Sequence, residues 1–329
     1  MSKKIIIIQI IFICLLAGLF VAYVRVVRTN LSRGATYIVA PISATSTMSG
    51  PVGDAPLINP VVTANLGKHF IINFKPLEDQ FRGIKAGFPE KTYVYFAYLN
   101  NSAFIGIGED TMFTAASTLK VPLAMAIMKM VENGQLSLSE SYTLSELDLD
   151  SNFGDLYKVG PNKTFSLQQL LEIMLKNSDN TAMQALIKVA RLIGVGDPFR
   201  DVYSFMGWSV DNLGAMPTYN KINLKTLSNM FTALYNATYD NVADSQLILG
   251  YLDDSIENDE IVAGIPKDIP VAHKFGVDLT DKTHSDCGII YAPHRNSLLC
   301  LGFIGGDQKT ADDFMRETSK AAYDFIMKN

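Results

Sequence analysis

Cysteine, histidine and tryptophan are scarce in this chain of 329 residues, which contains three, four and one of them respectively. Three cysteines are too few for a small fold held together by disulfides, and no C-x-x-C pair suggests a structural zinc site. His69, His284 and His294 lie far apart in the sequence without the spacing of metal ligands. We therefore expect neither a metal nor a cofactor.

Charged residues are also few, at 19% of the chain, whereas hydrophobic residues make up 48%. This balance is typical of a folded body and excludes a disordered chain. Residues 1–33 carry five basic groups and no acid, so residues 34–329 carry 23 basic groups against 33 acidic ones. A body this acidic is unsuited to nucleic acid, whose phosphates require a basic surface.

Residues 5–24 are uncharged, and as a helix they would span roughly 30 Å, the thickness of a bilayer core. A cleavable signal is the alternative, but signal cores run about 7–15 residues and no small-x-small cleavage site follows Val24. We favour an uncleaved N-terminal membrane anchor over residues 1–24. Residues 25–67, rich in Ser, Thr, Gly and Pro, are predicted to be a flexible linker.

The remaining residues, 68–329, predict an α+β fold. Apolar runs and periodicity predict strands at 93–99, 103–107, 271–277, 288–292 and 298–304, and helices at 117–132, 166–176, 180–192, 224–235 and the last 20 residues. Strands therefore precede and follow a block of helices. This order indicates a sheet lobe (68–116 and 245–329) with an inserted helical lobe (117–244).

The first of three candidate motifs is Ser117-Thr118-Leu119-Lys120. Residues three apart share a helix face, so the Lys120 amine can reach the Ser117 hydroxyl. Serine becomes a strong nucleophile when a neighbouring base takes its proton, and lysine can be that base if its pKa is lowered. By itself the motif also fits an ordinary exposed helix face.

The other two motifs are Ser178-Asp179-Asn180, between two predicted helices, and His273-Lys274-Phe275-Gly276 on a late strand. The former can simply cap a helix, or it can supply a proton relay and a substrate-binding amide. In the latter, a lysine within an apolar strand is costly unless it is paired, although an edge strand also tolerates lysine. Gly276 allows a neighbouring chain or a ligand to approach the backbone.

Together the three motifs resemble the active-site set of the penicillin-recognising serine enzymes, the class A β-lactamases and low-molecular-weight penicillin-binding proteins. The resemblance covers about residues 68–329 and implies a β-lactamase/transpeptidase-like fold, an antiparallel sheet lobe flanked by helices. It implies four catalytic residues and three substrate-binding residues in one cleft: Ser117, Lys120, Ser178 and Lys274, then Asn180, Gly276 and Val277. The Ser117 and Val277 backbone N–H groups would form the oxyanion hole.

The sequence departs from this family at three points. No glutamate occurs from Ile173 through Ile256, where an Ω-loop glutamate activates the deacylating water in class A enzymes, and residues 207–214 occupy a shortened loop with Asp211 as the nearest acid. Phe275 replaces the threonine that binds the substrate carboxylate, and Cys287 stands where many members have an arginine. These departures leave acylation intact and predict slow deacylation.

Two functions remain open. One is a serine acyl-enzyme hydrolase acting on β-lactams or on D-Ala-D-Ala peptidoglycan termini, held as a monomer outside the cytoplasm by its anchor. The other is a non-catalytic or slowly turning-over binder of penicillin or peptidoglycan at the cell surface. The complete set of reactive groups favours the enzyme, because a binder needs no nucleophile and base.

Two features of the packing are also predicted. Phe153, Leu156 and Tyr157 precede the second motif at the place where family members often have an aromatic cleft wall, although core packing would explain them equally well. Cys287 and Cys300 lie on strands that we expect to pair as a hairpin. Because direct cross-strand disulfides are geometrically demanding, we expect free buried thiols there.

Overall fold

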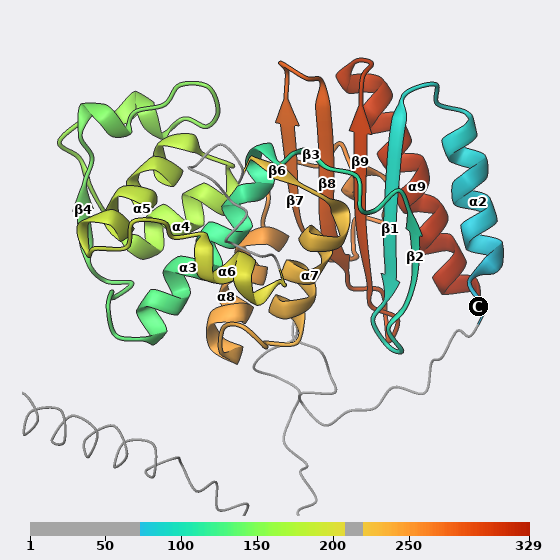
Figure 1. Ribbon diagram of the computed structural model, residues 1–329, viewed down its shortest axis with the longest axis horizontal. Coiled ribbons are helices and arrows are strands. Elements are labelled where there is room, and N and C mark those ends of the chain that lie inside the picture. Colours follow the sequence, from blue (N-terminus) through green and yellow to red (C-terminus); the bar gives the residue numbers. More distant parts are fainter. Residues whose placement is uncertain (1–72, 208–219) are drawn as a thin grey trace, which may run out of the picture. The chain divides into compact units, whose positions relative to one another are not determined.

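The computed structural model describes residues 73–207 and 220–329. A five-stranded antiparallel sheet has the order β2-β1-β9-β8-β7 (Figure 1). Its strands are β1 (Lys91–Tyr98), β2 (Ala103–Ile107), β7 (Val271–Asp278), β8 (Thr283–Ile290) and β9 (Ser297–Ile304). Strands from before and after the helical part of the chain therefore share one sheet, which confirms the predicted fold class.

Helices cover both faces of the sheet (Figure 1). Successive strand residues point to opposite faces, so Leu299 and Leu301 of β9 pack with α2 (Lys75–Ala86) and α9 (Gln308–Lys328). Leu298 and Cys300 instead join the core shared with α7 (Leu224–Tyr235) and the helical lobe. This double cover explains why the central strands carry few exposed side chains.

The helical part contains α3 (Lys120–Glu132), α4 (Leu167–Lys176), α5 (Asn180–Leu192), α6 (Arg200–Phe205) and α8 (Val242–Asp253). Helix α3 is buried over nearly its whole length and forms the centre of this core. The predicted capping box of α4 is present, since the Gln169 backbone N–H donates to Ser166 Oγ over 3.2 Å and Gln169 Oε1 accepts from the Ser166 N–H over 2.8 Å. Helices α2, α6 and α8 were not predicted.

The remaining elements are short. Strand β3 (Phe113–Thr114) pairs with β6 (Lys221–Ile222), and β4 (Ser141–Thr143) pairs with β5 (Thr164–Ser166). Single turns of 3₁₀ helix occur at η1 (Ala116–Leu119), η2 (Glu146–Asp148), η3 (Leu156–Val159) and η5 (Val262–Gly264). The helix predicted over 117–132 therefore begins as the 3₁₀ turn η1 and becomes α-helical at Lys120.

The expectation of free thiols is wrong. The predicted hairpin between β8 and β9 forms, and its register places Cys287 directly opposite Cys300 with their Cα atoms 3.9 Å apart. Residues directly opposite one another share a sheet face, and the two sulfurs form a disulfide. Strand β8 also begins earlier than predicted, at Thr283, because its polar first half is buried as a central strand rather than exposed as a loop.

Three predicted features fall wholly or mainly outside the described residues. The anchor (1–24) and linker (25–67) precede the described residues, and the shortened loop at 207–214 lies outside them from residue 208 onward. Across 73–207 and 220–329, no helix combines the length and the apolar character needed to cross a bilayer.

Candidate active site

Ser117 and Lys120 lie where the chain enters α3. The Ala115 N–H donates to Asn220 O over 2.8 Å, which holds this entry against the chain beside β6. Ala116 then takes a positive φ of 47°, an uncommon conformation for a residue with a side chain, and the chain turns into η1. Lys120 Nζ donates to Ser117 Oγ over 2.7 Å, so the predicted nucleophile and base are in direct contact.

The second motif lies between α4 and α5, as predicted. Asp179 is the N-cap of α5, accepting from the Ala182 N–H over 2.9 Å, and it also accepts from the Leu156 N–H over 2.8 Å. The capping interpretation therefore holds for Asp179 alone. Its neighbours face the first motif, since Lys120 Nζ donates to Asn180 Oδ1 over 2.8 Å and lies 3.4 Å from the Ser178 hydroxyl.

The third motif lies on β7, an edge strand of the sheet. Lys274 nevertheless has no exposed surface, so it is not a solvated edge lysine that merely discourages aggregation. Gly276 lets β7 lie close to the nucleophile, because a Cβ atom there would be 2.8 Å from Ala115 O and 3.1 Å from Thr118 Cγ2. The close approach predicted for this glycine is therefore made by the segment that carries Ser117.

Burial lowers the pKa of both lysines, and the charge of Lys274 lowers that of Lys120 further. Burial, together with the positive charge of Lys274, lowers the pKa of Lys120 to about 7, although Asp179 and Asp150 oppose the shift. Burial lowers the pKa of Lys274 to about 8, against the effect of Asp286, Glu260 and Glu257. Near neutral pH, Lys120 is thus partly unprotonated and can accept a proton, while Lys274 remains mainly charged.

A cleft of about 840 Å³ opens beside these groups, and we call it the motif cleft. Ser117, Lys120, Asn180 and Val277 line it, so both predicted oxyanion-hole residues reach the same cleft. Ser178, Lys274 and Gly276 are buried behind that surface or beside it. All seven residues predicted from the sequence thus lie in this region. Four of them line the cleft, and the other three are buried next to it.

The predicted aromatic wall is only partly present. Phe153 lines the motif cleft, and its ring centroid is 5.6 Å from that of Phe275. The Phe153 carbonyl accepts from the Asn180 N–H over 3.0 Å, which fixes this wall to the second motif. Leu156 packs into the helical core instead. Tyr157 neither lines the cleft nor joins that core, and its ring centroid lies 5.9 Å from Lys158 Nζ.

The acidic lining of the motif cleft was not predicted from the sequence. Glu257, Asp259 and Glu260 come from the segment before β7, and Asp278 and Asp312 follow from β7 and α9. The segment is held against the sheet because the Ile261 N–H donates to Asp286 Oδ2 over 3.2 Å and His273 Nε2 lies 3.2 Å from Glu257 O. These contacts are tertiary, so no local sequence signal announces them.

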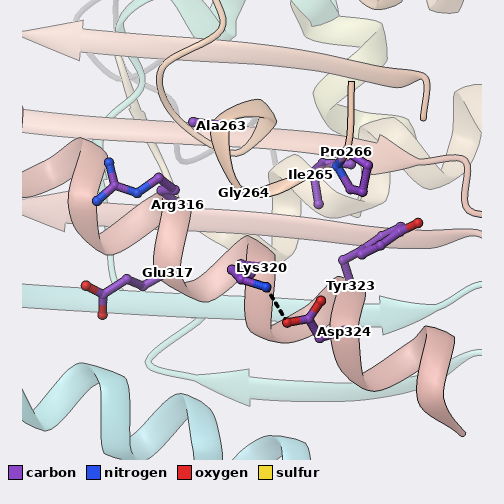
Figure 2. A pocket seen from close by; sticks show the side chains of 9 residues that line it. All are labelled: Ala263, Gly264, Ile265, Pro266, Arg316, Glu317, Lys320, Tyr323 and Asp324. Atoms are coloured by element: carbon purple, nitrogen blue, oxygen red, sulfur yellow. Dashed lines mark hydrogen bonds and ion pairs between the residues drawn. The ribbon is translucent and has the colours of Figure 1, made fainter. Parts of the chain in front are cut away.

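A second hollow, of about 300 Å³, lies between η5 and α9 (Figure 2). Its lining contains no residue of the three motifs. Lys320 and Asp324 pair with each other across one turn of α9 over 2.6 Å, so their charges are already balanced. This hollow therefore lies apart from the three motifs.

Comparison with known proteins shows the family of this chain. Residues 76–326 match the sequence profile of the Beta-lactamase enzyme family. The β-lactamase VEB-1 of Pseudomonas aeruginosa is 22% identical over 237 residues, which cover 65% of this chain and 77% of VEB-1. The extended-spectrum β-lactamase PER-1 of the same organism is 24% identical over 237 residues, which cover 66% of this chain and 76% of PER-1.

Solved structures show the same fold. PBP-A superimposes with a TM-score of 0.69 at 22% identity, covering 78% of this chain and 97% of PBP-A. A PBP-A mutant solved as an acyl-enzyme complex with penicillin G gives a TM-score of 0.68 at 22% identity, with 77% and 97% covered. The β-lactamase of Sphaerobacter thermophilus DSM 20745 gives a TM-score of 0.68 at 20% identity. The match covers 78% of this chain and 99% of that β-lactamase.

Gly276→Ala should separate β7 from the nucleophile segment, because the added methyl group meets backbone at 2.8 Å. We expect a loss of about 1–3 kcal/mol in unfolding free energy and slower acylation by penicillin. Gly250→Ala in α8 is the matched control, since nothing lies within 4 Å of its added Cβ. Denaturant unfolding and acylation kinetics check both variants, and equal behaviour of the two would contradict the close approach.

The rate of acylation should follow a bell-shaped pH profile. It should rise as Lys120 loses its proton around pH 7 and fall as Lys274 loses its own around pH 8. Stopped-flow acylation between pH 5.5 and 9.5 measures both limbs. Lys120→Ala should lose the acidic limb and about 10²–10⁴ in rate, whereas Lys225→Ala, an exposed lysine, should keep both. An acidic limb that persists in Lys120→Ala would assign it to another group.

Proposed function

We propose a substrate class and a mechanism for this chain on the premise that it belongs to the β-lactamase enzyme family and is a β-lactamase-like serine hydrolase. The substrates are β-lactams or the D-Ala-D-Ala termini of peptidoglycan stem peptides. One observation supports this most strongly: Lys120 Nζ contacts Ser117, Ser178 and Asn180 together. A nucleophile, a base and a relay hydroxyl are thereby assembled before any substrate binds.

Acylation follows from these contacts. Neutral Lys120 takes the proton of Ser117 Oγ, which forms a bond to the lactam or peptide carbonyl carbon. The backbone N–H groups of Ser117 and Val277 stabilise the oxyanion. As the tetrahedral intermediate collapses, the C–N bond breaks and the leaving nitrogen takes the Ser178 proton, which Lys120 replaces. Asn180 binds the substrate. The positive charge of Lys274 lowers the pKa of Lys120 and so favours its neutral form.

Deacylation is slow in this proposal, because a water that attacks the ester also needs a base. Among the described residues, no carboxylate is hydrogen-bonded to Ser117 or Lys120; their partners are each other, Ser178 and Asn180. Glu260 lines the motif cleft, but burial and its acidic neighbours raise its pKa to about 8, so it is mainly protonated at neutral pH. It is therefore a weak base under those conditions.

A slowly turning-over penicillin or peptidoglycan binder is the second candidate, and this scarcity of deacylation bases is what favours it. The substrate of either candidate lies outside the cytoplasm, as the predicted N-terminal anchor would require. The Cys287–Cys300 disulfide supports that location, since disulfides persist in oxidising compartments.

Ser117→Ala should abolish covalent labelling by a fluorescent penicillin, because Ser117 supplies the hydroxyl at the cleft surface that Lys120 deprotonates. The variant should stay folded, since loss of a small polar side chain at a helix start costs about 1 kcal/mol. Ser139→Ala, at an exposed serine, is the control and should label like the parent protein. Intact-mass spectrometry reads the adduct, and an adduct retained in Ser117→Ala would eliminate this nucleophile.

Turnover of benzylpenicillin should begin with a burst of one equivalent per enzyme, followed by a slow steady state. We expect acylation to exceed deacylation by at least about tenfold, which corresponds to some 1.4 kcal/mol of barrier difference. Stopped-flow absorbance measures both phases. Rapid linear turnover without a burst would show that a deacylation base is present, and the chain would then be an efficient β-lactamase.

A further inference from the structure

The turn between β7 and β8 is tied to the chain that precedes the nucleophile. Thr114 Oγ1 on β3 donates a hydrogen bond to Asp281 Oδ2 in this turn. Lys221 lies opposite Thr114 in the β3–β6 pair; its Nζ atom donates to Thr114 Oγ1 over 2.7 Å and lies 3.3 Å from Asp281 Oδ2. One hydroxyl thus joins three segments that are far apart in the sequence, and we call these three residues the turn clasp.

The hydroxyl of Thr114 is the centre of the turn clasp. Thr114 is only 3% exposed, whereas the side chains of Lys221 and Asp281 are 52% and 38% exposed. An exposed ion pair by itself contributes little to stability. A sheltered hydroxyl that accepts from an ammonium group and donates to a carboxylate instead forms two directional, charge-assisted hydrogen bonds. The turn clasp therefore depends on this hydroxyl more than on the direct contact between the two charges.

Each of the two joined segments carries one donor of the predicted oxyanion hole. Thr114 precedes Ser117 by three residues, and Asp281 follows Val277 by four. The close contact at Gly276 limits how near the two backbones can approach, but it does not fix their position along the strand. The hydrogen bonds of the turn clasp do fix it, because they are directional.

The turn is itself ordered by Asp278 at the end of β7. Asp278 Oδ1 accepts from the Thr280 N–H over 2.8 Å and from the Asp281 N–H over 3.3 Å. Fixing Asp281 therefore also fixes the end of β7, next to Val277. Leu279 and Thr280 of this turn line the motif cleft, so the turn clasp holds part of its wall as well.

We propose that the turn clasp is a positioning device for the oxyanion hole. It holds the Ser117 and Val277 backbone N–H groups at the spacing that the tetrahedral intermediate requires. The inference rests on the proposed acylation of Ser117 and adds to it three residues from outside the motifs. None of the three lines the motif cleft, so they act through the backbone rather than on the substrate. A displaced turn slows acylation without weakening the binding of the unreacted substrate, because the oxyanion exists only after attack.

Thr114→Val and Thr114→Ser test the hydroxyl, because valine keeps the branched shape without it and serine restores it. Stopped-flow acylation of the full chain by benzylpenicillin gives a limiting rate constant and a half-saturating concentration. Thr114→Val should lower the limiting constant about tenfold at an unchanged half-saturating concentration, and Thr114→Ser should retain the parent constants. Parent constants in Thr114→Val, an equal loss in both variants, or a change confined to the half-saturating concentration would overturn the proposal.

Asp281→Ala tests the turn clasp from its exposed side, where the fold tolerates substitution more easily. We again expect a limiting constant lowered by about tenfold. The matched control is Asp110→Ala, which removes an exposed carboxylate 3.7 Å from Lys225 Nζ and should keep the parent constants. An unchanged constant in Asp281→Ala, or an equal fall in the control, would contradict the assignment.

Phenylboronic acid gives a readout that a merely structural role would not move. Ser117 Oγ bonds to boron as its proton passes to Lys120, and the resulting tetrahedral boronate places an oxygen where the oxyanion forms. Its affinity should fall in Thr114→Val by the same factor as the limiting rate constant. Unchanged affinity alongside slower acylation would overturn the link to the oxyanion hole. Absence of penicillin labelling in the parent protein would instead overturn the proposed function, and this inference with it.

Discussion

Two ammonium groups buried close together are the constraint on which this site depends. Lys120 is 1% exposed and Lys274 has no exposed surface, so each is deprived of the water that would stabilise its charge. Their mutual repulsion adds to that cost. Near neutral pH it is therefore unfavourable for both lysines to be protonated at once. Lys120 is then partly neutral and can act as a base, whereas a solvated lysine would remain protonated.

The rest of the fold keeps these two lysines in place. Lys120 is attached to α3, which is buried throughout the helical core, and Lys274 belongs to a strand of the sheet. Gly276 permits the two to approach, and Asp179 fixes the intervening motif by capping α5 and holding the segment at Leu156. The destabilising pair is thus held by well-packed elements on each side, as expected for a preorganised site.

Much of this arrangement could be predicted from the sequence because it depends on local patterns. The spacing of Ser117 and Lys120 fixes their contact through helical geometry, and the order of strands and helices gives the sheet with its inserted helices. The acidic lining could not be predicted in this way. Glu257 and Glu260 reach the motif cleft only because tertiary contacts to His273 and Asp286 hold their segment there.

The Cys287–Cys300 disulfide also could not be predicted from local sequence. The hairpin of β8 and β9 follows from two apolar runs, but whether Cys287 faces Cys300 depends on a register that a shift of one residue would change. Helix α8 was missed because its sequence shows no amphipathic stripe, consistent with its contacts to several neighbouring elements. Helix α2 was missed although it does have one buried face, with Leu77 and Phe81, so local periodicity accounts for only part of the outcome.

Direct titration of the Lys120 amine tests the central claim. The Lys120 signal can be followed by NMR against pH in protein with isotopically labelled lysine, and assigned by its loss in Lys120→Ala. The account predicts a midpoint near pH 7, shifted upward when the positive charge is removed in Lys274→Met. A midpoint close to the ordinary lysine value of 10.5, unchanged in that variant, would contradict it.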